Sequence, residues 1–218
     1  MRGGTNMSNK TKNTDTLTLG MGCFWSPDAL FGSLPGVLRT RVGYAGGHSP
    51  DPTYREMGDH SETVEIDFDP GIVSIDEILN VFWNNHNPLN INGYKGRQYM
   101  SLLFYRDREQ QEAMHRVKQR MEQEKGKLDT EILPFTQFYI AEDRHQKYYL
   151  KRYPNAVEKM NILYCSEDEI TNSTLAARLN GLAKGYTNLQ QIKEEIEQWP
   201  ITPENQSRCM DLIRQIRW

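Results

Sequence analysis

The fold of this chain is decided near its start by the run Thr16-Leu17-Thr18-Leu19-Gly20-Met21-Gly22-Cys23-Phe24-Trp25. Its first six residues are mainly apolar or β-branched and are bounded by glycines, which predicts a strand over residues 16–21. Next comes Ser26-Pro27-Asp28, a cap-type residue, a proline suited to a first helical turn and an early acid. This order predicts a helix start. Cys23 therefore lies at a junction between a strand and a helix.

Strand and helix patterns alternate from this junction to about residue 150. Extended segments are expected at residues 37–44, 62–68, 100–105 and 132–140, and residues 62–68 alternate like a half-buried strand. A capping box of Ser74 and Glu77 predicts one helix. Two helical faces follow from the spacing of Ile75, Ile78, Leu79 and Phe82, and of Ala113, Met114, Val117 and Met121. The pattern predicts an α+β fold, a two-layer sandwich with a mixed sheet and a ferredoxin-like core.

Beyond residue 150 the pattern is helical only. One face carries Leu175, Leu179 and Leu182, and a later helix opens at Thr202-Pro203-Glu204 with Cys209 on its apolar stripe. We expect a disordered segment over residues 1–15, a catalytic domain over 16–155 and a helical C-terminal extension over 156–218.

Composition argues against several classes of protein. Among 218 residues the formal charge is −3 and both signs are interspersed, which gives no electrostatic case for nucleic acid or a membrane surface. No apolar run has the length of a membrane-spanning helix, and the N-terminal residues lack the apolar core of a secretory signal. With only three cysteines, a reducing compartment is expected. The cytoplasm is the prediction, with mitochondria as the open alternative.

The three cysteines, Cys23, Cys165 and Cys209, form no CxxC pair, and no His, Cys or carboxylate pair has metal-ligand spacing. A thiol reacts as thiolate, and a helix N-terminus favours that anion by only about 0.3–1 kcal/mol. Another group or the substrate must therefore activate Cys23. Its alternative interpretation is a small buried residue at a strand end. Phe24 and Trp25 argue against this, because they suit the walls of an apolar pocket beside the sulfur.

Further runs occur in a fixed order after Gly22-Cys23-Phe24-Trp25. They are Val42-Gly43-Tyr44-Ala45-Gly46-Gly47, Pro52-Thr53-Tyr54, His60-Ser61-Glu62, Phe82-Trp83, Arg97-Gln98-Tyr99, Thr130-Glu131-Ile132, Ala141-Glu142-Asp143 and His145-Gln146-Lys147-Tyr148. Over roughly residues 17–150 this ordered set resembles the A-type peptide methionine sulfoxide reductases. Residues 174–185 resemble the C-terminal extension of a subgroup that includes insect members.

The resemblance implies a reaction and its residues. Cys23 would attack the sulfur of methionine-S-sulfoxide in oxidised proteins, and would be left as a sulfenic acid when methionine leaves. Glu62 would protonate the sulfoxide oxygen, and Tyr54 and Tyr99 would hydrogen-bond it. Phe24 and Trp25 would hold the substrate's methyl group. The implied reductant is thioredoxin or another dithiol, with no bound cofactor or metal, and a monomer is expected.

Physical chemistry supports the pairing of Cys23 with Glu62. Adjacent like charges disfavour a thiolate beside a carboxylate, so one proton would be shared by the pair. An apolar, aromatic-walled site would further raise the carboxyl pKa, which keeps Glu62 able to act as an acid. Two tyrosine donors would act like an oxyanion hole. Without the resemblance, Glu62 would be an exposed strand residue and the tyrosines ordinary half-buried aromatics.

This chain departs from the family pattern in places. The usual acidic residue five positions after the cysteine is Asp28, to which we assign no catalytic role, and Asn92 or Tyr94 stands where an Asp is common. The resolving step is open. Cys209 lies on a packed stripe, Cys165 lies in a polar loop segment, and direct reduction of the sulfenic acid by an external thiol is the third route.

Two other functions compete with this interpretation. A cysteine hydrolase would need a Cys–His pair, and His48, His60, His86 and His145 are available, although none lies in a motif that orients it toward Cys23. A non-enzymatic interaction module could be built on the C-terminal helices. Consumption of dithiothreitol would distinguish the reductase from the hydrolase.

Overall fold

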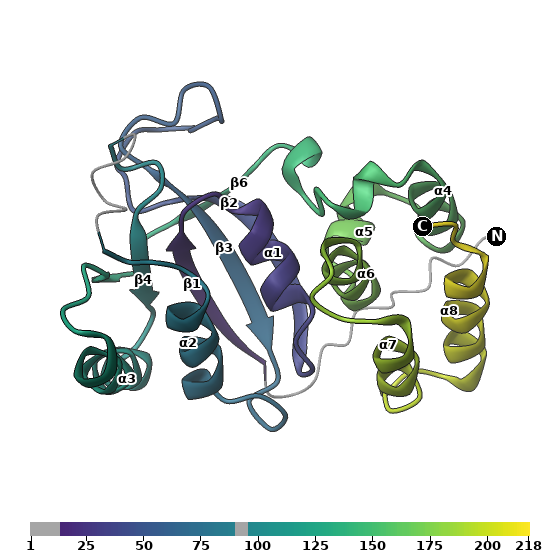
Figure 1. Ribbon diagram of the computed structural model, residues 1–218. Coiled ribbons are helices and arrows are strands. Elements are labelled where there is room, and N and C mark those ends of the chain that lie inside the picture. Colours follow the sequence, from purple (N-terminus) through teal and green to yellow (C-terminus); the bar gives the residue numbers. More distant parts are fainter. Residues whose placement is uncertain (1–13, 90–95) are drawn as a thin grey trace.

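The computed structural model describes residues 14–89 and 96–218 (Figure 1). Of the segment 1–15 predicted to be disordered, residues 1–13 lie outside the described residues, while Asp15 is the first residue of a strand. Asn92 and Tyr94, one of which was expected at the position where an Asp is common, also lie outside the described residues.

Six strands form one sheet in the order β5-β4-β1-β3-β2-β6. They are β1 (Asp15–Met21), β2 (Val37–Ala45), β3 (Ser61–Phe68), β4 (Ser101–Tyr105), β5 (Glu131–Pro134) and β6 (Phe138–Ile140). The inner four are antiparallel in the order β4-β1-β3-β2, with α1 (Trp25–Gly32) between β1 and β2 and α2 (Ile75–Asn84) between β3 and β4. β5 pairs parallel to β4, which makes the sheet mixed. The predicted α+β fold with a ferredoxin-like core is confirmed.

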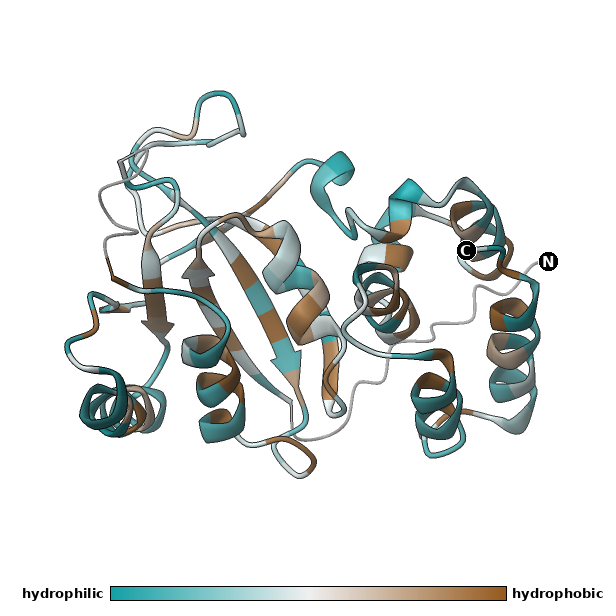
Figure 2. Cartoon of the chain, viewed as in Figure 1, coloured by the Kyte–Doolittle hydropathy of each residue, from teal (hydrophilic) through white to brown (hydrophobic). Residues whose placement is uncertain are grey.

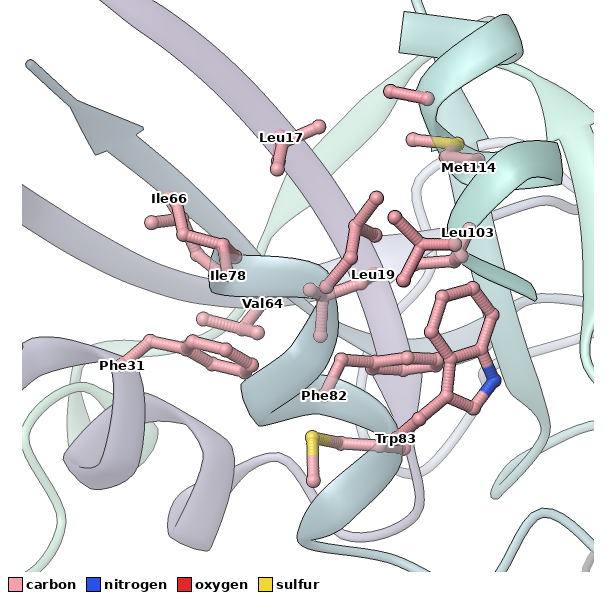
Figure 3. Packing of buried hydrophobic residues seen from close by; sticks show 14 of the residues in the cluster. Leu17, Leu19, Phe31, Val64, Ile66, Ile78, Phe82, Trp83, Leu103 and Met114 are labelled. Carbon is pink, nitrogen blue, oxygen red and sulfur yellow. The ribbon is translucent and has the colours of Figure 1, made fainter. Parts of the chain in front are cut away.

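The main core lies between this sheet and the helices α1, α2 and α3 (Arg108–Lys125). Figure 3 shows side chains from strands and helices meeting there, among them Leu19, Phe82 and Met114. The predicted capping box at Ser74 and Glu77 is present. Burial of this apolar face supplies most of the driving force for the sandwich, at roughly 25 cal/mol per Å² of apolar surface.

β3 differs from its prediction, because all eight of its residues are buried. Val64 and Ile66 face the helices, whereas Glu65 and Asp67 face the other side of the sheet. Arginines cover these carboxylates: Arg39 Nε lies 2.5 Å from Asp67 Oδ2, and Glu65 pairs with Arg41 and with Arg106. The prediction of a half-buried strand was wrong because it read the charged residues as solvent-facing, whereas neighbouring chain segments cover them.

The C-terminal part is helical, as the sequence predicts. It contains α4 (Pro154–Leu163), α5 (Glu167–Thr171), α6 (Thr174–Lys184), α7 (Leu189–Ile196) and α8 (Pro203–Gln215), preceded by the 3₁₀ turns η2 (Asp143–His145) and η3 (Leu150–Arg152). Figure 2 shows an apolar and a polar side on these helices, and the apolar sides form a second core. Thr202 caps α8, as predicted.

The boundary near residue 155 stays a prediction. Leu150 belongs to the C-terminal core, and α6 packs directly on α1 of the sheet layer (Figure 1). In the part of the chain that the structure describes, no helix has both the length and the apolar character needed to cross a membrane.

Candidate active site

The site lies where β1 ends and α1 begins. α1 begins at Trp25, with Phe24 as its cap residue, so the prediction that Ser26 caps this helix was wrong. Glu62 Oε2 accepts the backbone N–H of Phe24 at 3.1 Å, which is the bond that a capping side chain would make. The hydroxyl of Ser26 is instead 3.0 Å from the hydroxyl of Tyr149.

Glu62 is the second residue of β3 and is only 1 % exposed. It shares the helix-facing side of the strand with Val64 and Ile66, because side chains alternate along a strand. Its Oε1 accepts a hydrogen bond from Gln98 Nε2 at 2.8 Å, and its backbone N–H donates to the carbonyl of Gln98 at 2.9 Å. Glu62 is therefore a buried carboxyl that is oriented from two sides.

Cys23 adjoins this carboxyl and is open to the surface. Partial burial of the thiol raises its pKa, a hydrogen bond from the backbone of Trp25 lowers it, and the charge and hydrogen bond of Glu62 raise it further. The net pKa lies above the ordinary thiol value. The resting group is thus a thiol beside a carboxyl.

Two tyrosine hydroxyls meet beside this pair. The side chains of Tyr99 and Tyr54 are hydrogen-bonded, and burial together with the charge of Glu62 raises the pKa of Tyr99. The backbone N–H of Tyr54 donates to Glu142 Oε1 at 3.2 Å, and Glu142 Oε2 accepts the hydroxyl of Tyr44 at 2.7 Å. The Tyr54 backbone is therefore anchored to Glu142, and its side chain is joined to that of Tyr99.

An aromatic wall continues from Cys23. Trp25 stacks on Tyr148 with ring centroids 3.8 Å apart and planes 3° from parallel. Trp25 Nε1 donates to His145 Nδ1 at 3.2 Å, and the His145 ring lies 5.4 Å from that of Phe24. Phe24 is 1 % exposed, so it forms the deeper part of the wall.

The structure brings Cys23, Phe24, Trp25, Tyr54, Glu62 and Tyr99 together. It adds Gln98, Glu142, His145 and Tyr148, to which sequence reasoning gave no role. Each of these four residues belongs to one of the ordered sequence runs, which could have marked it as a site residue. Only the fold shows which groups its side chain contacts. The ring of His145 contacts Phe24, Trp25 and Tyr54, and its Nδ1 accepts the hydrogen bond from Trp25.

The other two cysteines lie in the helical extension. Cys209 is buried in the core around α8, where burial raises its pKa to about 11. Cys165 is exposed, and its backbone N–H donates to Glu169 Oε2 at 2.7 Å. Cys209 belongs to α8, and Figure 1 shows α6 between α8 and α1. Among residues 14–89 and 96–218 no cluster of three or more His, Cys, Asp or Glu side chains could hold a metal ion.

Comparison with known proteins agrees with this geometry. The family model described as peptide methionine sulfoxide reductase matches residues 15–178. The Drosophila melanogaster peptide methionine sulfoxide reductase is 42 % identical over 202 residues, covering 92 % of this chain and 80 % of that protein. Peptide methionine sulfoxide reductase A5 of Oryza sativa subsp. japonica is 39 % identical, and the match covers 78 % of this chain and 68 % of that protein.

Solved structures give the same result. Methionine sulfoxide reductase A of Corynebacterium diphtheriae is 33 % identical with a TM-score of 0.56, covering 67 % of this chain and 78 % of that one. Reduced Mxr1 of Saccharomyces cerevisiae is 26 % identical with a TM-score of 0.60, and the match covers 65 % of this chain and 87 % of that one. The chain therefore belongs to the peptide methionine sulfoxide reductase family and is a thiol-dependent oxidoreductase that returns oxidised methionine in proteins to methionine.

Proposed function

We propose that Cys23 is the nucleophile and Glu62 the acid in reduction of methionine-S-sulfoxide. The supporting observation is that Cys23 and Glu62 both interact with the N-terminus of α1. Glu62 Oε2 is bonded to the N–H of Phe24, and the thiol of Cys23 interacts with both Glu62 and the backbone of Trp25. A helix N-terminus stabilises negative charge, here on the thiolate or on the carboxylate.

The reaction balances within this site. Cys23 Sγ attacks the sulfoxide sulfur and the substrate S–O bond breaks; the transient bond between the two sulfurs then breaks as the oxygen bonds to Cys23 Sγ, which leaves a sulfenic acid and a free methionine side chain. Because the pKa of Cys23 is raised, its proton is retained until the substrate binds. Glu62 then passes this proton to the sulfoxide oxygen.

Tyr54 and Tyr99 would donate hydrogen bonds to the same oxygen as its charge develops. The raised pKa of Tyr99 keeps that hydroxyl protonated, as a donor must be. Phe24 and Trp25 would receive the methyl group and adjoining carbon of the substrate, since an aromatic face suits an apolar group next to a polar sulfoxide.

The second half-reaction needs two thiols from outside the site. Two equivalents of thiol convert the sulfenic acid to Cys23 thiol, water and a disulfide. We propose an external dithiol such as thioredoxin, without a bound cofactor, acting directly on Cys23, because Cys209 is buried and Cys165 belongs to the extension. A monomeric enzyme in a reducing compartment, the cytoplasm in the first instance, fits this scheme.

A single-turnover assay tests the proposal. The fully reduced enzyme, mixed with excess S-epimer of a methionine sulfoxide peptide and no reductant, should form one methionine per Cys23. The R-epimer should give none, and Cys23→Ser should give none with a retained fold. Methionine formation by Cys23→Ser would contradict the proposed nucleophile.

A further inference from the structure

A buried polar cluster lies behind the aromatic wall, where α1, β2, the segment before η3 and α6 meet. Its side chains, from Asp28, Thr40, Lys147 and Asn180, are each 0 % exposed. Asn180 Oδ1 accepts the backbone N–H of Tyr149 at 3.1 Å and of Leu150 at 3.0 Å. Asn180 Nδ2 donates to Asp28 Oδ2 at 3.1 Å. One amide thus joins α6, α1 and the chain that follows Lys147.

Lys147 turns the chain in a left-handed conformation, with φ of 52°, which a residue other than glycine adopts only when its surroundings hold it there. Its Nζ donates to Asp28 Oδ1 at 2.9 Å and to the carbonyl of Thr40 at 2.6 Å, and its N–H donates to Asp28 Oδ2 at 3.0 Å. Tyr148 follows directly and lies on Trp25. The turn therefore places the outer half of the aromatic wall.

Asn180 is itself held firmly, because α6 meets α1 backbone to backbone. A Cβ added to Gly32 would lie 2.9 Å from the carbonyl oxygen of Ala177, and one added to Gly181 would lie 2.9 Å from that of Ala29. Both sites are too tight for a larger residue. Figure 1 shows α6 alongside α1, and the close approach leaves α6 little freedom to shift.

The match to the family model ends at Arg178, so Asn180 lies beyond it. We propose that Asn180 is a positioning residue, contributed by the helical extension, that fixes Tyr148 on Trp25 and thereby sets the size of substrate group that the wall accepts. This rests on the proposed role of Trp25 in holding the methyl group. The extension is then a supporting layer of the active site rather than a separate interaction module.

The test compares two substrates in single turnover, the S-sulfoxides of N-acetylmethionine amide and of its S-ethyl homologue. The wild type should prefer the methyl compound. In Asn180→Leu the concentration giving half-maximal rate for the methyl compound should rise about tenfold, which corresponds to a loss of about 1.4 kcal/mol of binding free energy. The preference for methyl over ethyl should shrink, while the maximal rate stays within about twofold.

Ile192→Ala is the matched control, because Ile192 is 1 % exposed in α7, within the extension's own core. It should lower the melting temperature without changing the preference. Asn180→Asp keeps the acceptor for both N–H groups but replaces the donor to Asp28, and it serves in place of Asn180→Leu if that variant does not fold.

An unchanged methyl preference in folded Asn180 variants, or an equal change in Ile192→Ala, would overturn the positioning role. A failure of the proposed role of Trp25 looks different, because the wild type itself would then react equally well with the methyl and the ethyl compound.

Discussion

Glu62 Oε2 accepts the backbone N–H of Phe24 at 3.1 Å, so the carboxyl on β3 occupies the N-terminus of the helix that follows Cys23. The neighbouring N–H, of Trp25, is directed to the sulfur of Cys23. The carboxyl of Glu62 and the thiol of Cys23 therefore both accept hydrogen bonds from the N-terminus of α1. Since adjacent negative charges repel, the arrangement favours one negative charge and one retained proton, which is the state needed to protonate a leaving oxygen.

Glu62→Gln removes the acid while its amide oxygen still accepts from Phe24. We expect a retained fold and a single-turnover rate about 10²–10⁴ times lower, the usual contribution of a positioned general acid. Stopped-flow or quenched-flow measurement of methionine formation gives the rate. Glu112→Gln, at an exposed ion pair with Arg108 on α3, is the control and should react like the wild type. An equal rate in both variants would remove Glu62 from the mechanism.

The reactivity of Cys23 should report its raised pKa. Only the thiolate is alkylated, so labelling by iodoacetamide should be slow at pH 7 and should increase with pH, with a midpoint above that of an ordinary thiol. Burial is the largest cause of the raised pKa and Glu62 adds to it. Glu62→Gln should therefore move the midpoint down by removing a nearby negative charge. Peptide mapping separates Cys23 from Cys165 and Cys209, and an upward shift in the variant would be inconsistent with this electrostatic account.

The strand-to-helix junction at Cys23 was predictable because its signals are local. Glycines bound an apolar run, and Pro27 and Asp28 suit a first helical turn. The choice of Ser26 as the cap was wrong for a reason that lies elsewhere in the chain, since the N–H of Phe24 is taken by Glu62, 38 residues away. Local patterns indicate that a helix begins, but not which distant group satisfies its first N–H.

The burial of Glu62 could have been predicted from the alternation of side chains in its strand. The alternation that marks β3 places Glu62 on the same side as Val64, Ile66 and Phe68, so a carboxyl stands on the apolar side of the strand. By contrast, the burial of Glu65 and Asp67 depends on arginines from β2 and from beyond β4. The roles of Gln98 and Tyr148 likewise depend on tertiary contacts, with Glu62 and Trp25.

Arg178 should be important for the stability of the whole chain. It is 1 % exposed, pairs with Glu195 through two bonds, and donates to the carbonyls of Gly32 and Val37 at 2.7 and 2.8 Å. Arg178→Met would leave these carbonyls without their donor, at a cost of about 3 kcal/mol. Thermal unfolding should show a melting temperature lowered by roughly 6–12 °C.

The control for Arg178 is Arg214→Met, which breaks an exposed pair with Asp211 on α8. Exposed ion pairs contribute little to the free energy of unfolding, so the melting temperature of this variant should hardly change.

Deleting residues 166–218 removes Arg178 and Asn180 together, and should abolish both the folded state and methionine sulfoxide reduction. An active, folded truncation would contradict the view that α6 supports α1.

The fate of Cys23 after one turnover distinguishes the routes of reduction. With an external dithiol acting directly, Cys165→Ser and Cys209→Ala should both turn over with dithiothreitol at rates within about twofold of the wild type, because neither change reaches the N-terminus of α1 and substitutions away from a site are usually small in effect. Cys209→Ala should cost some stability, since the side chain is 1 % exposed. Peptide mapping after one equivalent of substrate should find Cys23 as a sulfenic acid trapped by dimedone. A disulfide from Cys23 to either of the other cysteines would contradict direct reduction, and one to Cys209 would require the extension to move, because a bridge needs Cα atoms within about 7 Å and Cys209 is packed in the second core.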